Sequence, residues 1–359
     1  KYNRSPKEAT DYFYSLSKNN NYIMTERINK NIVWKTNIEN YGDIDLSINL
    51  SKPEKDPKEI ALAKTAKQSG YPKCLLCKEN MGYEGNASHP PRANHRIIPV
   101  TLSDEQWYLQ YSPYGYFNEH CILLKGEHEP MAVTRKTFER LIGFVDKYPH
   151  YFMGSNAGLP VVGGSILTHD HYQGGNYEFP CAKADFRFKV KFEGFDDIEA
   201  GVVNWILSTI RIIGEDKERV IELASRINDA WTNFTSEEND ILAFTDAPHN
   251  AITPIARKRN GKFEMDLILR NNRTSEEHPY GIFHAHEEYH YIKKENIGLI
   301  EAMGLAVLPP RLTTQFGELT DEIKENIGQV FGKILENCAV FKNNEVGNKG
   351  ILDFVKTVK

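Results

Sequence analysis

A short segment between two glycine pairs constrains this chain more than any other. Its sequence is G-G-S-I-L-T-H-D-H-Y-Q-G-G, at residues 163–175. The residues just before this segment and in its N-terminal part are β-branched or aliphatic. They predict a strand that runs into a glycine turn. Because side chains alternate along a strand, we expect His169, His171 and Gln173 on one face, with the residues between them on the other.

Two imidazoles and a carboxamide in one row predict a site where a phosphate is attacked. A neutral imidazole is a good nucleophile near pH 7, because its reference pKa is about 6.5. Attack on phosphorus would give a phosphohistidine and divide one transfer into two displacements. Gln173 can donate a hydrogen bond to a phosphoryl oxygen without supplying a proton, which favours a transferase over a hydrolase. Backbone amides near Gly164 and Ser165, beside glycines without a Cβ, are expected to hold the phosphoryl oxygens. For His-x-His alone, a metal clamp or a packed polar pair is the alternative interpretation.

The full His-x-His-x-Gln pattern resembles the active-site strand of the galactose-1-phosphate uridylyltransferase family, a branch of the histidine-triad superfamily. The phrase Gly154-Ser155-Asn156-Ala157 and the 163–175 segment are similar to the second, bacterial class of that family. In the family, the second histidine takes a UMP group from UDP-glucose and passes it to galactose-1-phosphate. The resemblance therefore implies that His171 is the nucleophile and that Gln173 binds the phosphate.

The resemblance also implies the architecture. It predicts an α+β fold of two histidine-triad-like halves, each a mostly antiparallel sheet with helices packed on it. We expect an N-terminal segment at 1–70, a catalytic half at 71–195 and a second half at 196–359. Members of this class carry a sizeable region upstream of the point where this chain begins, so we expect that part of the protein precedes Lys1. The family is dimeric with sites completed across subunits, which implies a homodimer.

Composition narrows the class of protein further. The 359 residues leave room for one large domain or two medium ones. A net charge of −5 and a pI near 6.2 give no basic field for nucleic acid. The longest apolar runs are too short for a membrane span. Five cysteines, odd in number and with two in Cys-x-x-Cys, suit a reducing cytoplasm and a metal better than disulfides.

Cys74 and Cys77 form this Cys-x-x-Cys, which on a turn is half of a zinc site. A redox pair or ordinary reduced thiols are the alternatives, although the absence of a surrounding βαβ pattern argues against thioredoxin chemistry. The resemblance implies a structural zinc completed by two histidines, namely His169 and one that falls on His120. Such a metal would fix the strand beside the nucleophile without touching substrate. We interpret His128 as a capping or surface histidine.

A second His-x-His, at His284 and His286, lies on a strand-like segment and suggests internal duplication. No glutamine follows two residues on, because Glu288 occupies that position. The second copy is therefore expected to be structural or to help bind substrate. The resemblance implies a second metal here, iron or zinc, with His249 as the upstream ligand and His278, in a polar turn, as the alternative. A metal-free histidine pair is the alternative.

Two asparagines complete the expected substrate site. The resemblance places the uridine ribose near Asn94, with a turn-forming asparagine as the alternative. Asn156, just before the histidine row, is expected to hold the α-phosphate. Two rival functions share these residues. One is a nucleotidyl phosphorylase acting on an adenylylated substrate, and the other is a metal-stabilised nucleotide-binding protein without turnover.

Local patterns predict the elements around the row. Alternation predicts a strand at 44–50, and Asn260-Gly261 predicts a tight hairpin between strands at 252–257 and 263–269. Helical spacing and composition predict helices at 56–69, 135–147, 200–213, 216–234, 298–308 and 320–335.

Overall fold

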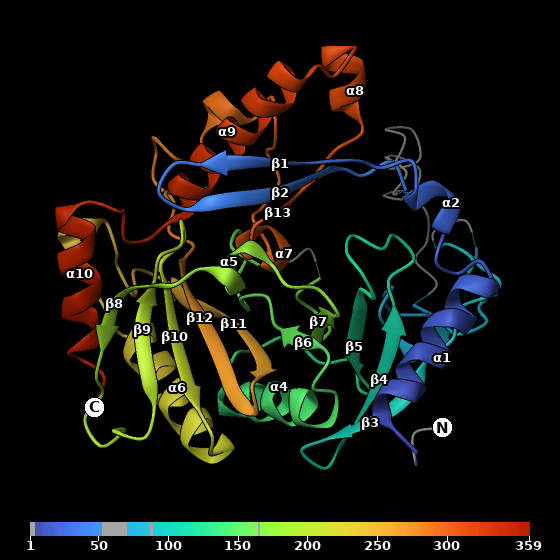
Figure 1. Cartoon of the computed structure of the whole chain (residues 1–359), viewed down its shortest axis with the longest axis horizontal. Coiled ribbons are helices and arrows are strands. Elements are labelled where there is room, and N and C mark those ends of the chain that lie inside the picture. The colour runs from blue at the N-terminus through green and yellow to red at the C-terminus, as the bar shows by residue number, and fades with distance from the viewer. Residues whose placement is uncertain (1–3, 52–69, 87–88, 164–165) are drawn as a thin grey trace.

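The computed structural model of the chain describes residues 4–51, 70–86, 89–163 and 166–359. A ten-stranded sheet lies at its centre, and a three-stranded sheet lies over one face of it (Figure 1). In spatial order, the strands of the large sheet are β3 (Ile98–Leu102), β4 (Glu105–Tyr111), β5 (Cys121–Lys125), β7 (His171–Gly175), β6 (Phe152–Gly154), β11 (Asn250–Arg259), β12 (Lys262–Asn271), β10 (Thr209–Gly214), β9 (Glu199–Val203) and β8 (Phe186–Val190).

Two successive stretches of chain build the large sheet on the same plan. In each, three strands lead through one long helix to two further strands, and the last strand inserts beside the third. The helix is α4 (Arg135–Lys147) in the first stretch and α6 (Lys217–Thr232) in the second. All neighbouring strands of this sheet run antiparallel. The predicted α+β fold of two similar halves is confirmed.

The two halves meet where β6 pairs with β11. Met153 lies opposite Ala256, and Gly154 lies opposite Ile255. A Cβ on Gly154 would come within 3.0 Å of the carbonyl oxygen of Pro254, so only glycine fits this contact without a shift. The junction is therefore a short, close pairing of two strands.

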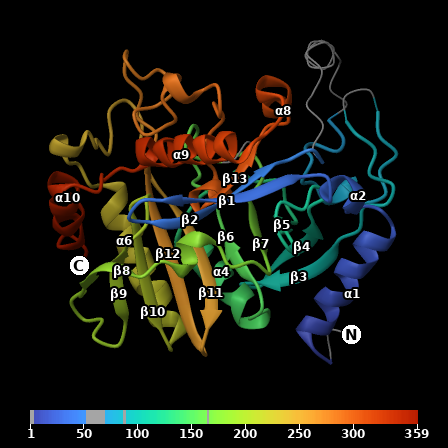
Figure 2. The same cartoon turned by 45° about the horizontal axis from the view of Figure 1, so that its top comes forward.

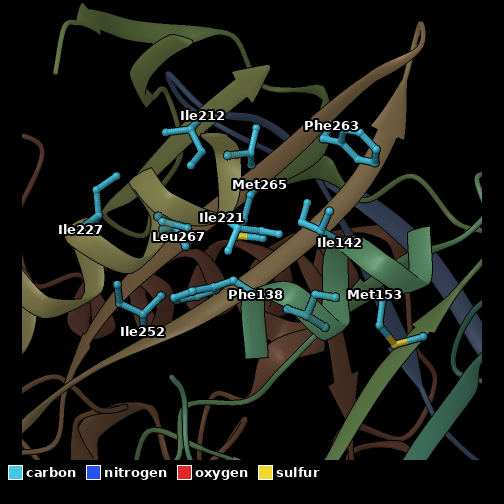
Figure 3. Close-up of a cluster of buried hydrophobic side chains, with 14 of the residues drawn as sticks. Phe138, Ile142, Met153, Ile212, Ile221, Ile227, Ile252, Phe263, Met265 and Leu267 are labelled. Atoms are coloured by element: carbon cyan, nitrogen blue, oxygen red, sulfur yellow. The ribbon is translucent and has the colours of Figure 1, made fainter. Parts of the chain in front are cut away.

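Helices α4 and α6 cover one face of the large sheet and share one hydrophobic core with it. Thr134 caps α4 through a capping box with Thr137, and Asp216 accepts hydrogen bonds from the first amides of α6. The core draws side chains from both helices and from strands of both halves (Figure 3), among them Phe138, Ile142, Met153, Ile212, Ile221, Ile252, Met265 and Leu267. Because the core is common to both halves, burying it also stabilises their junction.

The small sheet and a long helix cover the opposite face. The sheet consists of β1 (Ile32–Ile38), β2 (Gly42–Ile48) and β13 (Leu305–Leu308), with β13 parallel to β2. Helix α9 (Asp321–Cys338) lies on its outer side (Figure 2). The helix approaches closely at Gly328, where a Cβ would stand 2.0 Å from the hydroxyl oxygen of Thr36. A second core fills the space between the two sheets.

The remaining described helices are short or peripheral. They are α1 (Pro6–Asn19), α2 (Thr25–Ile28), α5 (Pro180–Lys183), α7 (Leu299–Ala302), α8 (Arg311–Phe316), α10 (Glu345–Val355) and the 3-10 turns η1 (Lys78–Asn80), η2 (Glu237–Asn239) and η3 (Glu287–Tyr289). Within the described part of the chain, no helix is both long and apolar enough to cross a bilayer.

Most of the predicted elements are confirmed, and two of the predicted helices are wrong. The hairpin at Asn260-Gly261, the strand near 44–50 and the helices at 135–147, 216–234 and 320–335 are present. The predicted helix at 200–213 consists instead of β9 and β10, because its β-branched residues pair with β12 and β8. The predicted helix at 298–308 ends after one turn and continues as β13. The predicted helix at 56–69 lies outside the described residues.

Gly304 explains why the predicted helix at 298–308 ends after one turn. Its φ of +103° is unfavourable for other residues, and it ends the turn of α7. The following Leu-Ala-Val-Leu then pairs with β2, Leu305 opposite Asp45 and Leu308 opposite Ile48. Such a short apolar run shows no periodicity by which a buried strand could be distinguished from a buried helix.

Candidate active site

His171 and Gln173 of the histidine row lie on β7, an interior strand of the large sheet, whereas His169 lies just before this strand. β5 pairs with one edge of β7 and β6 with the other. The strand begins at His171, so the prediction of a strand running through 161–167 is wrong: the described residues of that segment form no strand. Tyr172 lies on the face covered by α4, where its ring stacks on Trp107 at 4.8 Å between centroids. The predicted alternation therefore places His171 and Gln173 on the opposite face, towards the small sheet.

The two glycines after the row serve strand packing. A Cβ on Gly174 would stand 2.3 Å from the carbonyl oxygen of Phe152 on β6. Gly175 has a φ of +153°, and a Cβ there would stand 2.7 Å from the carbonyl oxygen of Glu119. These positions fix how closely β6 and the start of β5 approach β7. Gly164 and Ser165, whose amides were expected to hold phosphate, lie outside the described residues.

His171 is buried, and its ring is fixed in one tautomer. Its Nδ1 lies 2.8 Å from the carbonyl oxygen of His169, and since a carbonyl only accepts, Nδ1 carries the proton. Nε2 is then left with its lone pair, and no described residue makes a hydrogen bond to it. Burial lowers the pKa of His171 to about 4, so the ring is neutral at pH 7. A neutral imidazole with a bare Nε2 is the form that a nucleophile requires.

Gln173 is held by a histidine from the neighbouring strand end. The Nε2–H of His120 donates to Oε1 of Gln173, with 3.0 Å between the two atoms. Since Oε1 accepts this bond, the amide nitrogen of Gln173 is turned away from His120. The carboxamide is therefore presented as a hydrogen-bond donor.

Four side chains form a candidate metal centre next to this row. They are Cys74, Cys77, His128 and His169, and their ligand atoms all lie within 4.8 Å of one another. The Sγ of Cys74 lies 3.2 Å from Nδ1 of His169, and the Sγ of Cys77 lies 3.2 Å from Nδ1 of His128. Two thiols and two imidazoles are the donor set of a structural tetrahedral zinc site.

Surrounding groups orient this centre. His169 Nε2–H donates to the carbonyl oxygen of Lys125 at 2.9 Å, which leaves Nδ1 unprotonated towards the thiols. The side-chain amide of Asn80 donates to the carbonyl oxygens of Cys74 and Cys77, both at 2.8 Å. The Cys-x-x-Cys turn and one imidazole are thus already arranged for a cation.

The prediction of His120 as a ligand is wrong, and the pairing of β5 with β7 gives the reason. Cys121 lies opposite Gly174, and Leu124 lies opposite His171. Because the strands are antiparallel, the residues before β5 lie near Gln173, whereas those after β5 lie near His169. His128 follows β5 and contributes to the metal centre. Its interpretation as a capping or surface histidine is wrong for the same reason.

The second metal site is not formed. His249 is held by Asn272 Oδ1 at 2.9 Å and by Thr245 Oγ1 at 2.7 Å, while His284 contacts Asn296 Oδ1 at 3.2 Å. His286 contacts the carbonyl oxygen of Ile282 at 3.2 Å. No group of three or more ligand side chains includes any of these histidines among the described residues. These three histidines therefore form no ligand cluster in the described structure, and a second metal on them stays a prediction.

A second error follows from the topology. The His284–His286 segment lies outside the strands, after β12. The strand that occupies the place of β7 in the second half is β12, and the face of β12 towards the small sheet carries charged residues. Asp266 accepts from Arg211 at 2.6 and 3.0 Å and from Arg257, and Arg257 also pairs with Glu264. Here the duplicated strand carries a buried ion cluster in place of a histidine row.

The two predicted substrate asparagines have structural partners. The side-chain amide of Asn94 donates to the carbonyl oxygen of Asn20 at the end of α1, at 2.9 Å. Oδ1 of Asn156 accepts from the backbone N–H of Leu299 at 2.8 Å and so caps α7. Asn156 is buried at the sheet end beside the row, whereas Asn94 lies in a separate turn.

Comparisons with known proteins agree across the chain. Family models described as galactose-1-phosphate uridyl transferase, N-terminal domain and C-terminal domain, match residues 1–130 and 144–333. A relative from Clostridium acetobutylicum, named galactose-1-phosphate uridylyltransferase, is 55% identical, with 99% of this chain and 71% of the relative aligned. Relatives of the same name from Clostridium perfringens strain 13 and Bacillus subtilis strain 168 are 50% and 49% identical, with 79% and 76% of their lengths aligned.

The comparison with solved structures finds a yeast Ap4A phosphorylase, Apa2. It is 14% identical, has a TM-score of 0.47, and the match covers 92% of this chain and 95% of the yeast chain.

Proposed function

This chain belongs to the galactose-1-phosphate uridylyltransferase family, and we propose that it transfers UMP from UDP-glucose to galactose-1-phosphate through His171. The observation that carries the proposal is the tautomer of His171. Its Nδ1–H is bound to the carbonyl oxygen of His169, so the lone pair of Nε2 is available for attack.

The first displacement uses this lone pair. Nε2 attacks the α-phosphorus of UDP-glucose, an N–P bond forms, and the P–O bond to the β-phosphate breaks. Glucose-1-phosphate leaves with the electron pair of that bond. The ring gains positive charge as the N–P bond forms, and the carbonyl oxygen of His169 is already placed to stabilise it through Nδ1–H.

The second displacement reverses the first. A phosphate oxygen of galactose-1-phosphate attacks the same phosphorus, the N–P bond breaks, and UDP-galactose leaves. His171 returns to the neutral ring with its proton still on Nδ1. The amide nitrogen of Gln173 donates to a non-bridging oxygen in both steps, which places a neutral donor where negative charge develops.

We propose that Cys74, Cys77, His128 and His169 hold a structural zinc ion. The ion would supply no chemistry to the transfer, and it would fix the position of His169. Since the backbone carbonyl oxygen of His169 accepts the hydrogen bond from Nδ1–H of His171, the metal centre and the nucleophile both contact His169. We also propose that the protein is a homodimer, as the family resemblance implies, and that it is cytoplasmic, as its cysteine usage suggests. The predicted boundary between residues 195 and 196 should move to before β8, because β8 pairs with β9 of the second half. Sedimentation velocity would reveal a monomer if the dimer is wrong.

The test of the activity is covalent capture. The protein is mixed with UDP-glucose alone, and its intact mass is measured. We expect an increase of one UMP, which galactose-1-phosphate removes with release of UDP-galactose. ADP-glucose serves as the control, because an adenylyl adduct would support a nucleotidyl phosphorylase, and no adduct with either donor would contradict a covalent transferase.

A further inference from the structure

We propose that His120 is a positioning residue, which orients the carboxamide of Gln173 towards the phosphoryl group. The inference rests on the proposed function and concerns a residue that does not itself touch the reacting atoms. Its basis is the 3.0 Å contact between Nε2 of His120 and Oε1 of Gln173.

A glutamine can present either end of its amide to a phosphate, and the two ends have opposite effects. The NH₂ group donates to a phosphoryl oxygen, whereas the carbonyl oxygen would repel it. A donor on the carbonyl side removes this ambiguity. Because His120 is 3% exposed and burial lowers its pKa to about 4, it is a neutral imidazole, and its single N–H is directed at Gln173.

The ring of His120 is fixed by its surroundings. It stacks against Tyr116 and packs against Phe117, with centroid separations of 5.3 and 4.4 Å. Its backbone N–H donates to the carbonyl oxygen of Phe117 at 3.2 Å, and its own carbonyl oxygen accepts from the N–H of Ser112 at 2.8 Å. A ring held on both sides and through its backbone can fix the group to which it bonds.

The residue before His120 adds to this rigidity. Glu119 has a φ of +54°, which is unusual for a residue with a side chain. Its carboxylate accepts hydrogen bonds from Tyr151 Oη at 2.5 Å and from Asn176 Nδ2 at 3.3 Å. These contacts keep the strained turn in place, and the turn delivers His120 to Gln173.

The other nitrogen of His120 argues against a purely structural role. Nδ1 is buried, and no described residue partners it. A buried polar atom without a partner lowers stability, so an apolar ring would suit this aromatic pocket better. The feature that distinguishes histidine from phenylalanine here is the hydrogen bond to Gln173.

The experiment compares four single variants with the wild type in steady-state kinetics, and then Gln173→Ala alone and combined with His120→Phe. His120→Phe keeps an aromatic ring but removes the donor, and His120→Asn keeps an amide that is too short to reach Gln173. His120→Gln keeps an amide donor near the position of Nε2. Ser208→Ala is the matched control, since Ser208 is buried in the second half and makes two hydrogen bonds to the backbone of Phe341.

We expect kcat to fall about 10- to 100-fold in His120→Phe and His120→Asn, with little change in KM for UDP-glucose. His120→Gln should recover most of kcat, and Ser208→Ala should keep it. Adding Gln173→Ala to His120→Phe should be no slower than Gln173→Ala alone, because both changes remove one function. Circular dichroism and thermal unfolding identify any variant that does not fold.

The role of His120 would be refuted by wild-type kcat in His120→Asn, by equally slow His120→Gln and His120→Asn, or by additive losses in the double variant. These results presuppose that the wild type gains one UMP from UDP-glucose. If it does not, the proposed function fails independently of His120.

Discussion

The Nδ1–H of His171 donates to the carbonyl oxygen of His169, with 2.8 Å between the two atoms. His169 in turn directs its ring into the Cys-His cluster, with Nδ1 3.2 Å from Cys74. One residue therefore connects the candidate metal centre with the candidate nucleophile, through its side chain on one side and its backbone on the other.

Replacing the nucleophile should stop the reaction without preventing binding. In His171→Asn no ring nitrogen can attack phosphorus, and we expect sugar exchange to fall by ~10⁴-fold or more. Isothermal titration should still detect UDP-glucose, and the intact mass should show no UMP adduct. Exchange at the wild-type rate in this variant would exclude His171 as the nucleophile.

Two histidine variants should differ in metal content. His128→Asn removes an imidazole from the cluster of four ligands, so bound zinc, measured by inductively coupled plasma mass spectrometry, should fall well below one per chain. His120→Asn should retain zinc, because its ring contacts Gln173 instead. Zinc lost from the second variant and kept in the first would mean that the assignment of the ligands is reversed.

A methyl group at Gly174 should disturb the strand that carries the row. The added Cβ would meet the carbonyl oxygen of Phe152 at 2.3 Å, and we expect Gly174→Ala to lower the free energy of unfolding by ~1–3 kcal/mol. Gly143→Ala is the control, since it lies in α4 with nothing within 4 Å of the new Cβ, and it should be neutral or stabilising by up to ~1 kcal/mol. Urea unfolding measures both, and equal stability of the two variants would contradict the close approach of β6.

The ion cluster on β12 should contribute to stability. Burial alone would raise the pKa of Asp266, but the guanidinium groups of Arg257 and Arg211 lower it below its usual value. Asp266→Asn leaves both arginines without their buried partner, and we expect a loss of ~3–5 kcal/mol in the free energy of unfolding. Glu199→Gln, in an exposed pair with Lys189, should cost less than ~1 kcal/mol.

The lowered pKa of Asp266 predicts how the free energy of unfolding changes in acid. A group with a lowered folded pKa stabilises the protein above its unfolded value of about 3.9, and that contribution is lost as pH falls below it. The free energy of unfolding should therefore decrease less steeply below about pH 4 in Asp266→Asn than in the wild type. Identical slopes would mean that Asp266 does not titrate in this range.

Local patterns predicted the parts of the fold that depend on neighbouring residues. The hairpin at Asn260-Gly261 forms because both residues adopt positive φ, of +51° and +80°. The helix at 135–147 forms because its apolar spacing matches one buried face. The alternation of His171, Tyr172 and Gln173 is likewise a property of one strand and was predictable.

Contacts between distant strands were not predictable in this way. Whether His120 or His128 lies beside His169 depends on the register of β5 against β7, which no local pattern specifies. The order of the elements did carry a usable signal. In an antiparallel pair, the residues that follow one strand lie beside the residues that precede the other, as His128 and His169 do. The second His-x-His was misleading because its spacing imitates the first, while the duplicated strand is defined by pairing and carries Asp266.

The short pairing of β6 with β11 has a consequence for dividing this protein. Expressed alone, the first half would end its sheet at β6, with unpaired backbone groups along an exposed edge and half of a shared core open to water. Such an edge recruits other chains, so separate expression of the halves would favour aggregation. Coexpressed fragments that find each other would restore the pairing of β6 with β11, next to the strand that carries His171.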